Sequence, residues 1–189
     1  MVWISLSASK LVCVYELRVI MITGQPLWPR FLPTNWVINF ATLGPLGRVK
    51  KGPGTFGSLA GLIYFTVFFA PLSWWLVVLL SLPPLYLAVA LCGEAEFRLG
   101  QRDPGMVVLD EFVVMPLCFL GWETLPAAPW VVFLTGFALF RLFDVTKPLG
   151  ISRLQNLPGG WGVVLDDVAA AFAACASLHG VGRVYSHWF

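Results

Sequence analysis

The sequence predicts an all-α protein, a polytopic membrane bundle of about five spanning helices with an interfacial N-terminal segment. Three observations support this class. Of 189 residues, 58% are hydrophobic and only 12% are charged, whereas about 25% of residues are charged in an average soluble domain. The mean hydropathy is +0.80. The apolar residues form long segments, and the basic residues gather at one end of those segments, as they do in membrane proteins.

Five apolar segments are expected to cross the membrane: residues 55–69, 74–91, 106–120, 130–143 and 161–178. A crossing needs about 20 residues at a rise of 1.5 Å each. The last three segments must therefore include their charged flanks. A shorter apolar stretch, residues 36–46, predicts a helix that lies in the membrane interface.

Residues 1–35 are predicted to form an N-terminal extension, and residues 36–189 the membrane domain. The extension has neither the long apolar region nor the small-residue cleavage site of a signal peptide. Met21 offers a second plausible start, and no motif precedes it. A chain that begins at Met21 is therefore expected to insert and work normally.

Basic residues predict the orientation of the bundle. They lie before the first segment, between the second and third, and after the fourth: Arg48, Lys50, Lys51, Arg98, Arg102, Lys147 and Arg153. The opposite loops, residues 70–73 and 121–129, contain no Lys or Arg. Since basic loops stay in the cytoplasm, the basic end is predicted to face the cytoplasm of a bacterial inner membrane.

Most acidic residues fall at the same end, and several lie within the predicted spans. Asp110 and Asp166 lie about one helical turn inside the third and fifth segments, and Asp144 directly follows the fourth, about one turn before Pro148. A carboxylate in the membrane costs at least about 2.5–3.5 kcal/mol, which a shared cation would offset. Mg²⁺ prefers oxygen ligands and commonly joins carboxylates to phosphate oxygens. The predicted magnesium ligands are Asp103, Asp110, Glu111, Asp144, Asp166 and Asp167.

Other interpretations of these acids remain open. The acidic pairs could be interfacial charges that pair with Arg141 and Lys147, although two pairs together with Asp103 and Asp144 favour a site. Arg141 and Asp144 are three residues apart and can touch across one helical turn. A cation carrier would also place acids in the membrane, but at several depths rather than at one.

A glycine-rich segment, residues 52–58, opens the first predicted span. It contains GxGxxG, but it follows basic residues rather than an apolar strand, so a dinucleotide site is not indicated. A glycine-rich turn at a helix N-terminus presents backbone N–H groups to an anion. The predicted phosphate-binding residues are Lys51, Gly54, Thr55, Gly57 and Ser58. Thr55 and Ser58 could equally cap the helix, and Asp103 could cap the helix of the third segment.

Several functions are not indicated. The net charge is only +2, and no basic groove with interleaved aromatics suggests nucleic-acid binding. Four dispersed cysteines, without CxxC spacing, are predicted to be buried thiols. His179 and His187 lie beyond the acids, at the other end of the last segment, and are expected to be incidental.

Four short motifs in three ordered blocks resemble the phosphatidylglycerophosphatase A family. They are PGTFGSLA at 53–60, DPGMVVLDEF at 103–112, and FRLFDVTKP at 140–148 followed by GGWGVVLDDV at 159–168. The resemblance covers about residues 41–178. Val114 stands where the family often has Gly, and Leu149-Gly150 replaces a bulky residue followed by Pro. No acid is lost by these departures, but they bear on substrate preference and helix packing.

The resemblance implies an all-helical enzyme that uses Mg²⁺ to hydrolyse the phospholipid phosphatidylglycerophosphate to phosphatidylglycerol. The expected catalytic residues are Asp110, Glu111, Arg141, Asp144, Lys147 and Asp167. Attack by water and attack by an aspartate use the same residue types. A phosphatase for phosphatidate or a polyprenyl phosphate is the alternative enzyme, since the site indicates a phosphate more clearly than a headgroup.

Overall fold

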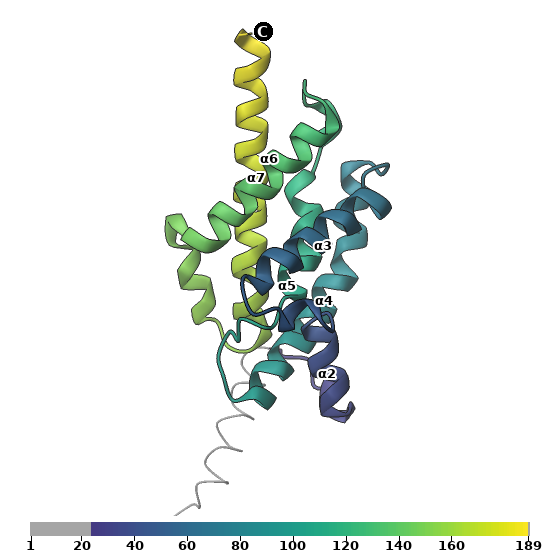
Figure 1. The fold of residues 1–189 in the computed structure, drawn as a ribbon, viewed down its shortest axis with the longest axis vertical. Helices are drawn as coiled ribbons and strands as arrows, with labels where there is room; N and C mark the ends of the chain where they lie inside the picture. Colours follow the sequence, from purple (N-terminus) through teal and green to yellow (C-terminus); the bar gives the residue numbers. More distant parts are fainter. Residues whose placement is uncertain (1–23, 189) are drawn as a thin grey trace, which may run out of the picture.

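The computed structural model describes residues 24–188, apart from the side chains of Leu149 and Trp188. Within that range every regular element is helical (Figure 1). The predicted all-α class is therefore confirmed. The α-helices are α2 (Thr34–Ala41), α3 (Pro53–Phe68), α4 (Trp74–Leu99), α5 (Leu109–Val114), α6 (Pro129–Thr146) and α7 (Gly160–Trp188). Five 3-10 helices join them: η1 (Trp28–Phe31), η2 (Leu46–Arg48), η3 (Met115–Phe119), η4 (Trp122–Thr124) and η5 (Pro148–Asn156).

Three described helices, α4, α6 and α7, are long and apolar enough to cross a membrane, judged by length and composition. The sequence predicts about five full spans, but the helices of the first and third predicted segments are shorter than the other three. Helix α3 has 16 residues, which is about 24 Å. The third segment is a six-residue α5 followed by a five-residue η3, about 19 Å together. Pro116 lies at the start of η3, and its missing N–H ends the α-helical bonding.

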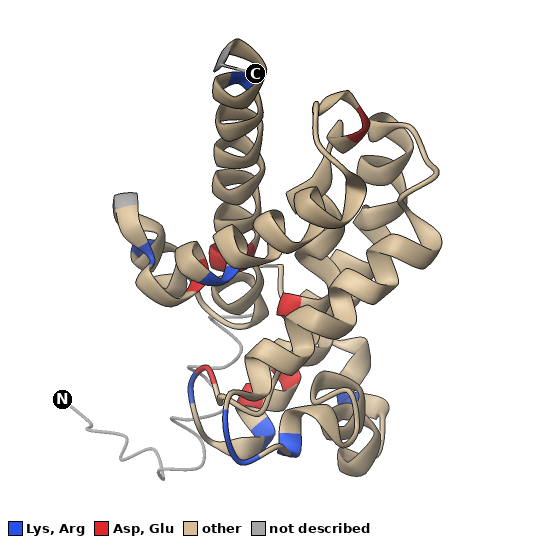
Figure 2. Ribbon diagram, turned by 45° about the horizontal axis from the view of Figure 1, so that its top comes forward, with Lys and Arg blue, Asp and Glu red and all other residues tan. Residues whose placement is uncertain are grey.

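The chain runs back and forth between two ends of the molecule (Figure 1). Loops 70–73 and 121–128 and the C-terminus lie at the upper end, while α2 and loop 100–108 lie at the lower end. This arrangement agrees with the two groups of loops that the basic residues predict. Figure 2 shows that blue Lys and Arg segments gather at the lower loops, with red acidic segments between them and the middle of the bundle.

Glycines allow two close contacts between helices. Gly54, Gly57 and Gly61 face α5, where an added Cβ would meet Glu111, Val108 and Met115 at 2.1, 2.7 and 2.5 Å. Helix α7 meets α4 at Gly160, where an added Cβ would lie 1.8 Å from the carbonyl oxygen of Val89. Small residues thus bring α5 and α7, two carriers of the acids, close to α3 and α4.

The rest of the core is aromatic and aliphatic. Phe65 of α3 stacks on Phe119 of η3 with ring centroids 4.5 Å apart, and Phe133 of α6 packs on both. Small residues of α7 also belong to the core, since Ala170 and Ala174 are fully buried.

The residues before α2 are attached to the bundle. The Gln25 amide donates to the Val89 carbonyl at 3.1 Å and accepts from the Gly160 N–H at 3.0 Å. Arg98 of α4 donates to the carbonyls of Pro29 and Leu32, both at 2.9 Å. The segment from residue 25 therefore packs against the membrane domain, which the sequence predicts to begin at residue 36. Residues 1–23 lie outside the described part.

Helix α2 lies within the stretch predicted to be interfacial. It buries Val37 and Ala41 and exposes Trp36 and Phe40, and the preceding Phe31 is 89% exposed. Aromatic side chains of this kind are typical of membrane–water interfaces. This exposure agrees with the interfacial location that the sequence predicts.

Candidate functional site

All six predicted magnesium ligands line one cavity of about 160 Å³. They come from separate parts of the chain: Asp103 from the loop after α4, Asp110 and Glu111 from α5, Asp144 from α6, and Asp166 and Asp167 from α7. Lys147 completes the charged lining. The tertiary structure therefore brings together acids that are up to 64 residues apart in the sequence. We call this space the acidic cavity.

Local structure directs these side chains toward the cavity. Helix α5 begins at Leu109, so Asp110 and Glu111 lie in its first turn, where the helix dipole favours negative charge. Lys147 caps the C-terminus of α6 in the left-handed conformation, with φ 43°. This conformation is uncommon for a residue other than glycine. It ends the helix before Pro148, and Lys147 there reaches Asp166 of α7.

Arg141 joins three elements at one side of the cavity. Its Nη1 atom lies 2.7 Å from Asp144 Oδ2 and 2.8 Å from Glu111 Oε2. The same atom is 3.2 Å from Ser58 Oγ. The predicted contact of Arg141 with Asp144 across one turn is confirmed. Arg141 thus fixes α6 to α5 and α3 beside the cavity.

Lys147 forms an ion pair with Asp166. Burial alone would lower the pKa of Lys147, but the hydrogen bond and charge of Asp166, with further help from Asp167 and Asp144, raise it above the usual value. Lys147 is therefore cationic at neutral pH. A cation in this position can attract an anionic group into the cavity.

Negative charge exceeds positive charge in the cavity. Arg141 pairs with both Glu111 and Asp144, and Lys147 pairs with Asp166, so two cations face three carboxylates. None of these ion pairs includes Asp110 or Asp167, each only 4% exposed. The Oδ1 atom of Asp166 is also buried without a hydrogen-bond partner among the described residues. Buried carboxylates without cations are costly. The site thus has an unmet requirement for positive charge.

The residues that line the acidic cavity are of the chemical type that binds a magnesium ion. The lining offers carboxylate oxygens, which Mg²⁺ prefers, and one of these oxygens lacks a partner. In the described part of the chain, no three His, Cys, Asp or Glu side chains already form a group that could hold a metal ion. The donors therefore line one space without forming a ready-made ligand set.

The predicted phosphate-binding segment has another visible role. Gly54 and Gly57 pack against Glu111 and Val108. Ser58 is buried, and its hydroxyl lies 2.8 Å from the Gly54 carbonyl and 2.7 Å from Glu111 Oε2. The carboxylate of Glu111 therefore already lies beside the start of α3.

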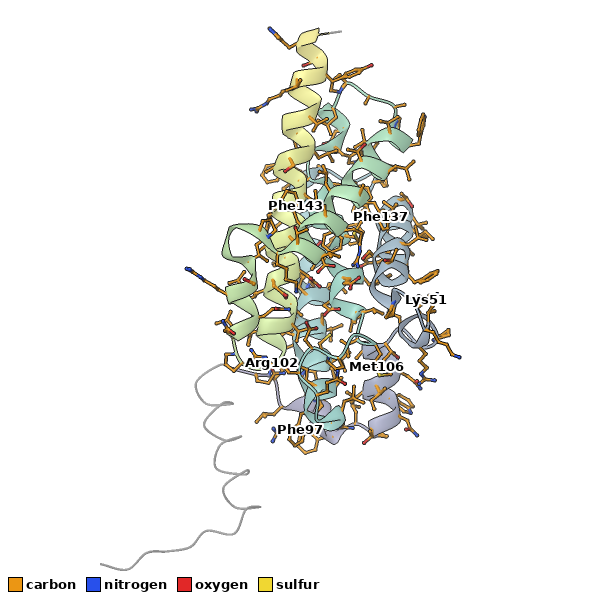
Figure 3. The ribbon with its side chains drawn as sticks, turned by 60° about the vertical axis from the view of Figure 1, so that its left-hand side comes forward. Lys51, Phe97, Arg102, Met106, Phe137 and Phe143 are labelled. Carbon is orange, nitrogen blue, oxygen red and sulfur yellow. The ribbon has the colours of Figure 1, made fainter. Side chains whose placement is uncertain are left out.

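Two further members of that predicted set lie on the surface. Thr55 and Lys51 are exposed, and Lys51 lies at the outer edge of the molecule in Figure 3. Phosphate binding by these two residues stays a prediction.

Asp103 lines the acidic cavity but does not cap a helix. Helix α5 begins six residues later, after Val108, so the capping interpretation is wrong. Instead, the Asp103 N–H donates to Glu96 Oε1 at 2.5 Å, and its Oδ2 accepts from Gln155 at 2.9 Å. Sequence reasoning missed Glu96 and Gln155. No local motif marks them: Glu96 belongs to the end of α4, before the loop that carries Asp103, and Gln155 belongs to η5, which is distant in the sequence.

The incidental residues lie where the sequence places them. His179 hydrogen-bonds the Leu120 carbonyl at 2.7 Å, near the end of the molecule opposite the basic loops. Cys92, Cys118 and Cys175 are free thiols, and the first two are buried. Cys13 and Glu16 lie outside the described residues.

Three apolar helices of membrane length accompany a cavity lined by carboxylates and a lysine, with an arginine paired to two of those carboxylates. These features are those expected of a membrane-bound phosphatase. The comparison with known proteins is specific. The sequence model of the phosphatidylglycerophosphatase A family matches residues 39–182, and the chain belongs to this family. It is accordingly a phosphatase associated with membrane phospholipid.

Two relatives bear the family's name. The phosphatidylglycerophosphatase A of Haemophilus influenzae is 35% identical over 129 residues, 68% of this chain and 77% of the relative. The phosphatidylglycerophosphatase A of Escherichia coli is 34% identical over 141 residues, which are 72% of this chain and 76% of the relative. A Bacteroides thetaiotaomicron protein, provisionally named a phosphatidylinositol-3-phosphatase, is 37% identical over 156 residues, 75% of this chain and 88% of that protein. No solved structure matches the chain.

Proposed function

We propose that this protein removes the terminal phosphate of phosphatidylglycerophosphate to give phosphatidylglycerol. The reaction would depend on Mg²⁺ and take place at the cytoplasmic face of a bacterial inner membrane. The observation that supports it most is the acidic cavity, in which six carboxylates and Lys147 meet in a chain related to two phosphatidylglycerophosphatases. The one-sided basic loops support the cytoplasmic location.

The residues of the cavity suit hydrolysis of a phosphate monoester. Asp110, Asp166 and Asp167 would hold the magnesium ion, which when bound would neutralise phosphate charge. Lys147 stabilises the charge on the phosphoryl group as it is transferred. A carboxylate of the cavity takes a proton from the attacking water, whose oxygen bonds to phosphorus. The ester P–O bond breaks, and the glycerol oxygen leaves with a proton.

A panel of lipid phosphates tests the substrate. The purified protein would be assayed for phosphate release from phosphatidylglycerophosphate, phosphatidate, a polyprenyl phosphate and phosphatidylinositol 3-phosphate, with Mg²⁺ or with EDTA. We expect the highest kcat/KM for phosphatidylglycerophosphate and at least a tenfold loss in EDTA, about 1.4 kcal/mol, restored by added Mg²⁺. Full activity in EDTA would refute the metal, and preference for another lipid would refute the substrate.

Phosphatidylinositol 3-phosphate is included because of one observation. The relative with that provisional name covers the largest share of this chain among the three reported. Its substrate also carries a phosphate monoester on a polyol headgroup. The acidic cavity suits the monoester of either lipid, so headgroup recognition must involve other residues.

A further inference from the structure

A second cavity lies directly beside the acidic cavity. It measures about 290 Å³ and shares two lining residues with the acidic cavity, Asp103 and Val163. Together, the two cavities reach the lower part of the range of about 300–1,000 Å³ that is typical of ligand sites. Its other polar lining residues are Glu96, Arg102, Gln155 and Asn156. The phosphate chemistry proposed above uses none of these four.

The second cavity is formed by the end of α4, the following loop, η5 and the start of α7. Its glycines are structural, since a Cβ on Gly162 would lie 2.3 Å from the Leu157 carbonyl oxygen. Figure 3 shows Arg102 in the lower part of the molecule, where Phe97 and Met106 are also labelled. The second cavity therefore lies at the end that carries the basic loops, where lipid headgroups are expected.

Asp103 separates the two cavities and is held from both sides. Its N–H donates to Glu96 and its carboxylate accepts from Gln155. Arg102, the neighbouring residue, donates to the Gln155 carbonyl. A guanidinium has five N–H donors, so others are left for a ligand. The outer side of the wall thus presents the cation of Arg102 together with the Glu96 carboxylate, which already accepts from the Asp103 N–H. The inner side presents several carboxylates and Lys147.

The charges of the two cavities match a ligand with two different phosphates. The acidic cavity suits a phosphate monoester that arrives with a metal ion. Arg102 suits a phosphodiester. Its single positive charge matches the single negative charge of the diester, and its guanidinium can donate to the phosphate oxygens. Glu96 and Asn156 can hydrogen-bond a hydroxyl group. In phosphatidylglycerophosphate, a glycerol with one free hydroxyl joins the monoester to a phosphodiester.

We propose that the second cavity binds the glycerol and the phosphodiester of the substrate, with Arg102 on the diester oxygens and Asn156 on the glycerol hydroxyl. This assignment rests on the proposed function. It places headgroup selection in the α4–α5 loop and η5, outside the acidic cavity. Relatives whose names give different headgroups would then share the acidic cavity and differ in the residues of the second one.

The test compares Arg102→Gln with Arg153→Gln in purified protein in mixed micelles. Arg153 is an exposed arginine of η5 that does not line the cavity, so this control removes the same charge from the same region. Inhibition by the two products separates the two cavities. Phosphatidylglycerol carries only the diester and glycerol, whereas inorganic phosphate mimics only the monoester.

We expect Arg102→Gln to raise KM for phosphatidylglycerophosphate, and the inhibition constant of phosphatidylglycerol, by at least about tenfold. The kcat and the inhibition constant of inorganic phosphate should stay within about twofold, since neither depends on the diester. Arg153→Gln should change none of these by more than about twofold. Asn156→Ala, a smaller change, should raise KM in the same direction.

Three results would overturn the assignment. One is an unchanged KM in both Arg102→Gln and Asn156→Ala. Another is an equal effect of Arg153→Gln, which would indicate general surface charge. The third is an equal rise in the inhibition constants of inorganic phosphate and phosphatidylglycerol, which would indicate a disturbed acidic cavity. Failure of the wild-type protein to hydrolyse phosphatidylglycerophosphate, with hydrolysis of another lipid phosphate, would instead refute the proposed function.

Discussion

Asp144 and Asp167 occupy different situations in the acidic cavity. Asp144 is paired with Arg141 at 2.7 Å, whereas Asp167 is buried and takes part in none of the described ion pairs. They lie on separate helices, α6 and α7, yet line the same cavity. If both serve one magnesium-dependent site, each should be needed for turnover regardless of its ion pairing.

We predict that Asp144→Asn and Asp167→Asn each lower turnover at least about 100-fold, or about 2.7 kcal/mol of transition-state stabilisation. Asparagine keeps the size of aspartate and one of its oxygen acceptors but removes the charge, so a packing role would survive it. The measurements are kcat in purified protein and yield in the membrane fraction. The double variant should lose little more than the worse single variant, because residues of one unit are not additive.

Glu123→Gln is the matched control for these two changes. Glu123 is exposed, belongs to η4 and does not line the acidic cavity, so the loss of its charge should leave turnover unchanged. Near-normal hydrolysis without magnesium by either well-inserted aspartate variant would contradict a shared site. It would favour the interpretation of the acids as interfacial charges.

At the scale of the helices, the contact between α4 and α7 leaves no space for a side chain at Gly160. Helix α7 carries Asp166 and Asp167, and its first residue, Gly160, lies against the backbone of α4 at Val89 and Gly93. The Gly160 N–H also donates to Gln25. The position of both aspartates therefore depends on a contact between backbones, which cannot yield as a flexible side chain can.

Gly160→Ala is expected to separate these two helices. Its Cβ would lie 1.8 Å from the Val89 carbonyl oxygen, and overpacking of this kind typically costs about 1–3 kcal/mol. We expect a lower midpoint of thermal unfolding in detergent and at least about a tenfold loss of turnover. Both follow from displacement of α7 relative to α5 and α6.

Gly180→Ala provides the control on the same helix. A Cβ at Gly180 meets nothing within 4 Å, and alanine favours a helix over glycine by about 1 kcal/mol. Unfolding midpoint and turnover should therefore be unchanged or slightly raised. Equal effects of the two substitutions would show that the α4–α7 contact does not position the site.

The whole molecule has two chemically different ends, and this asymmetry predicts its orientation. Single cysteines at exposed positions of opposite ends, Glu123→Cys and Ser152→Cys, can be labelled in intact cells with a membrane-impermeant maleimide. Position 123 should react from the periplasm, and position 152 should react only after the membrane is opened. The parent protein measures background labelling of the native cysteines. The reverse pattern, or equal access, would contradict a cytoplasmic acidic cavity.

Two shortened chains test the N-terminal boundary. A chain that starts at Met21 keeps Gln25 and the carbonyls that Arg98 binds, so membrane yield and specific activity should match those of the full chain. A chain without residues 1–35 loses these contacts and leaves the guanidinium of Arg98 without several acceptors. Since unsatisfied groups are costly, its yield should fall at least about threefold. Loss of activity in the Met21 chain would mean that the earlier residues are structural.

The sequence by itself was sufficient to determine the class of the fold, the family and the acids that line the acidic cavity. Apolar segments, one-sided basic loops and the acids near the segment ends are local features, and each can be recognised without knowing what lies beside it. All six acids that these features single out as magnesium ligands line one cavity. The contact of Arg141 with Asp144 was also predictable, because residues three apart on a helix are neighbours.

Only the tertiary structure decided which charges meet, how far each apolar segment continues and where the second cavity lies. Lys147 pairs with Asp166, and Arg141 with Glu111, since those choices depend on how α6 crosses α5 and α7. The glycines of α3 are required because α5 approaches them closely, a distance that no motif encodes. Likewise, Gln155 reaches Asp103 only because η5 packs against the loop that follows α4. Such contacts depend on the packing of distant segments, whereas periodicity and composition report only on the segment in which they occur.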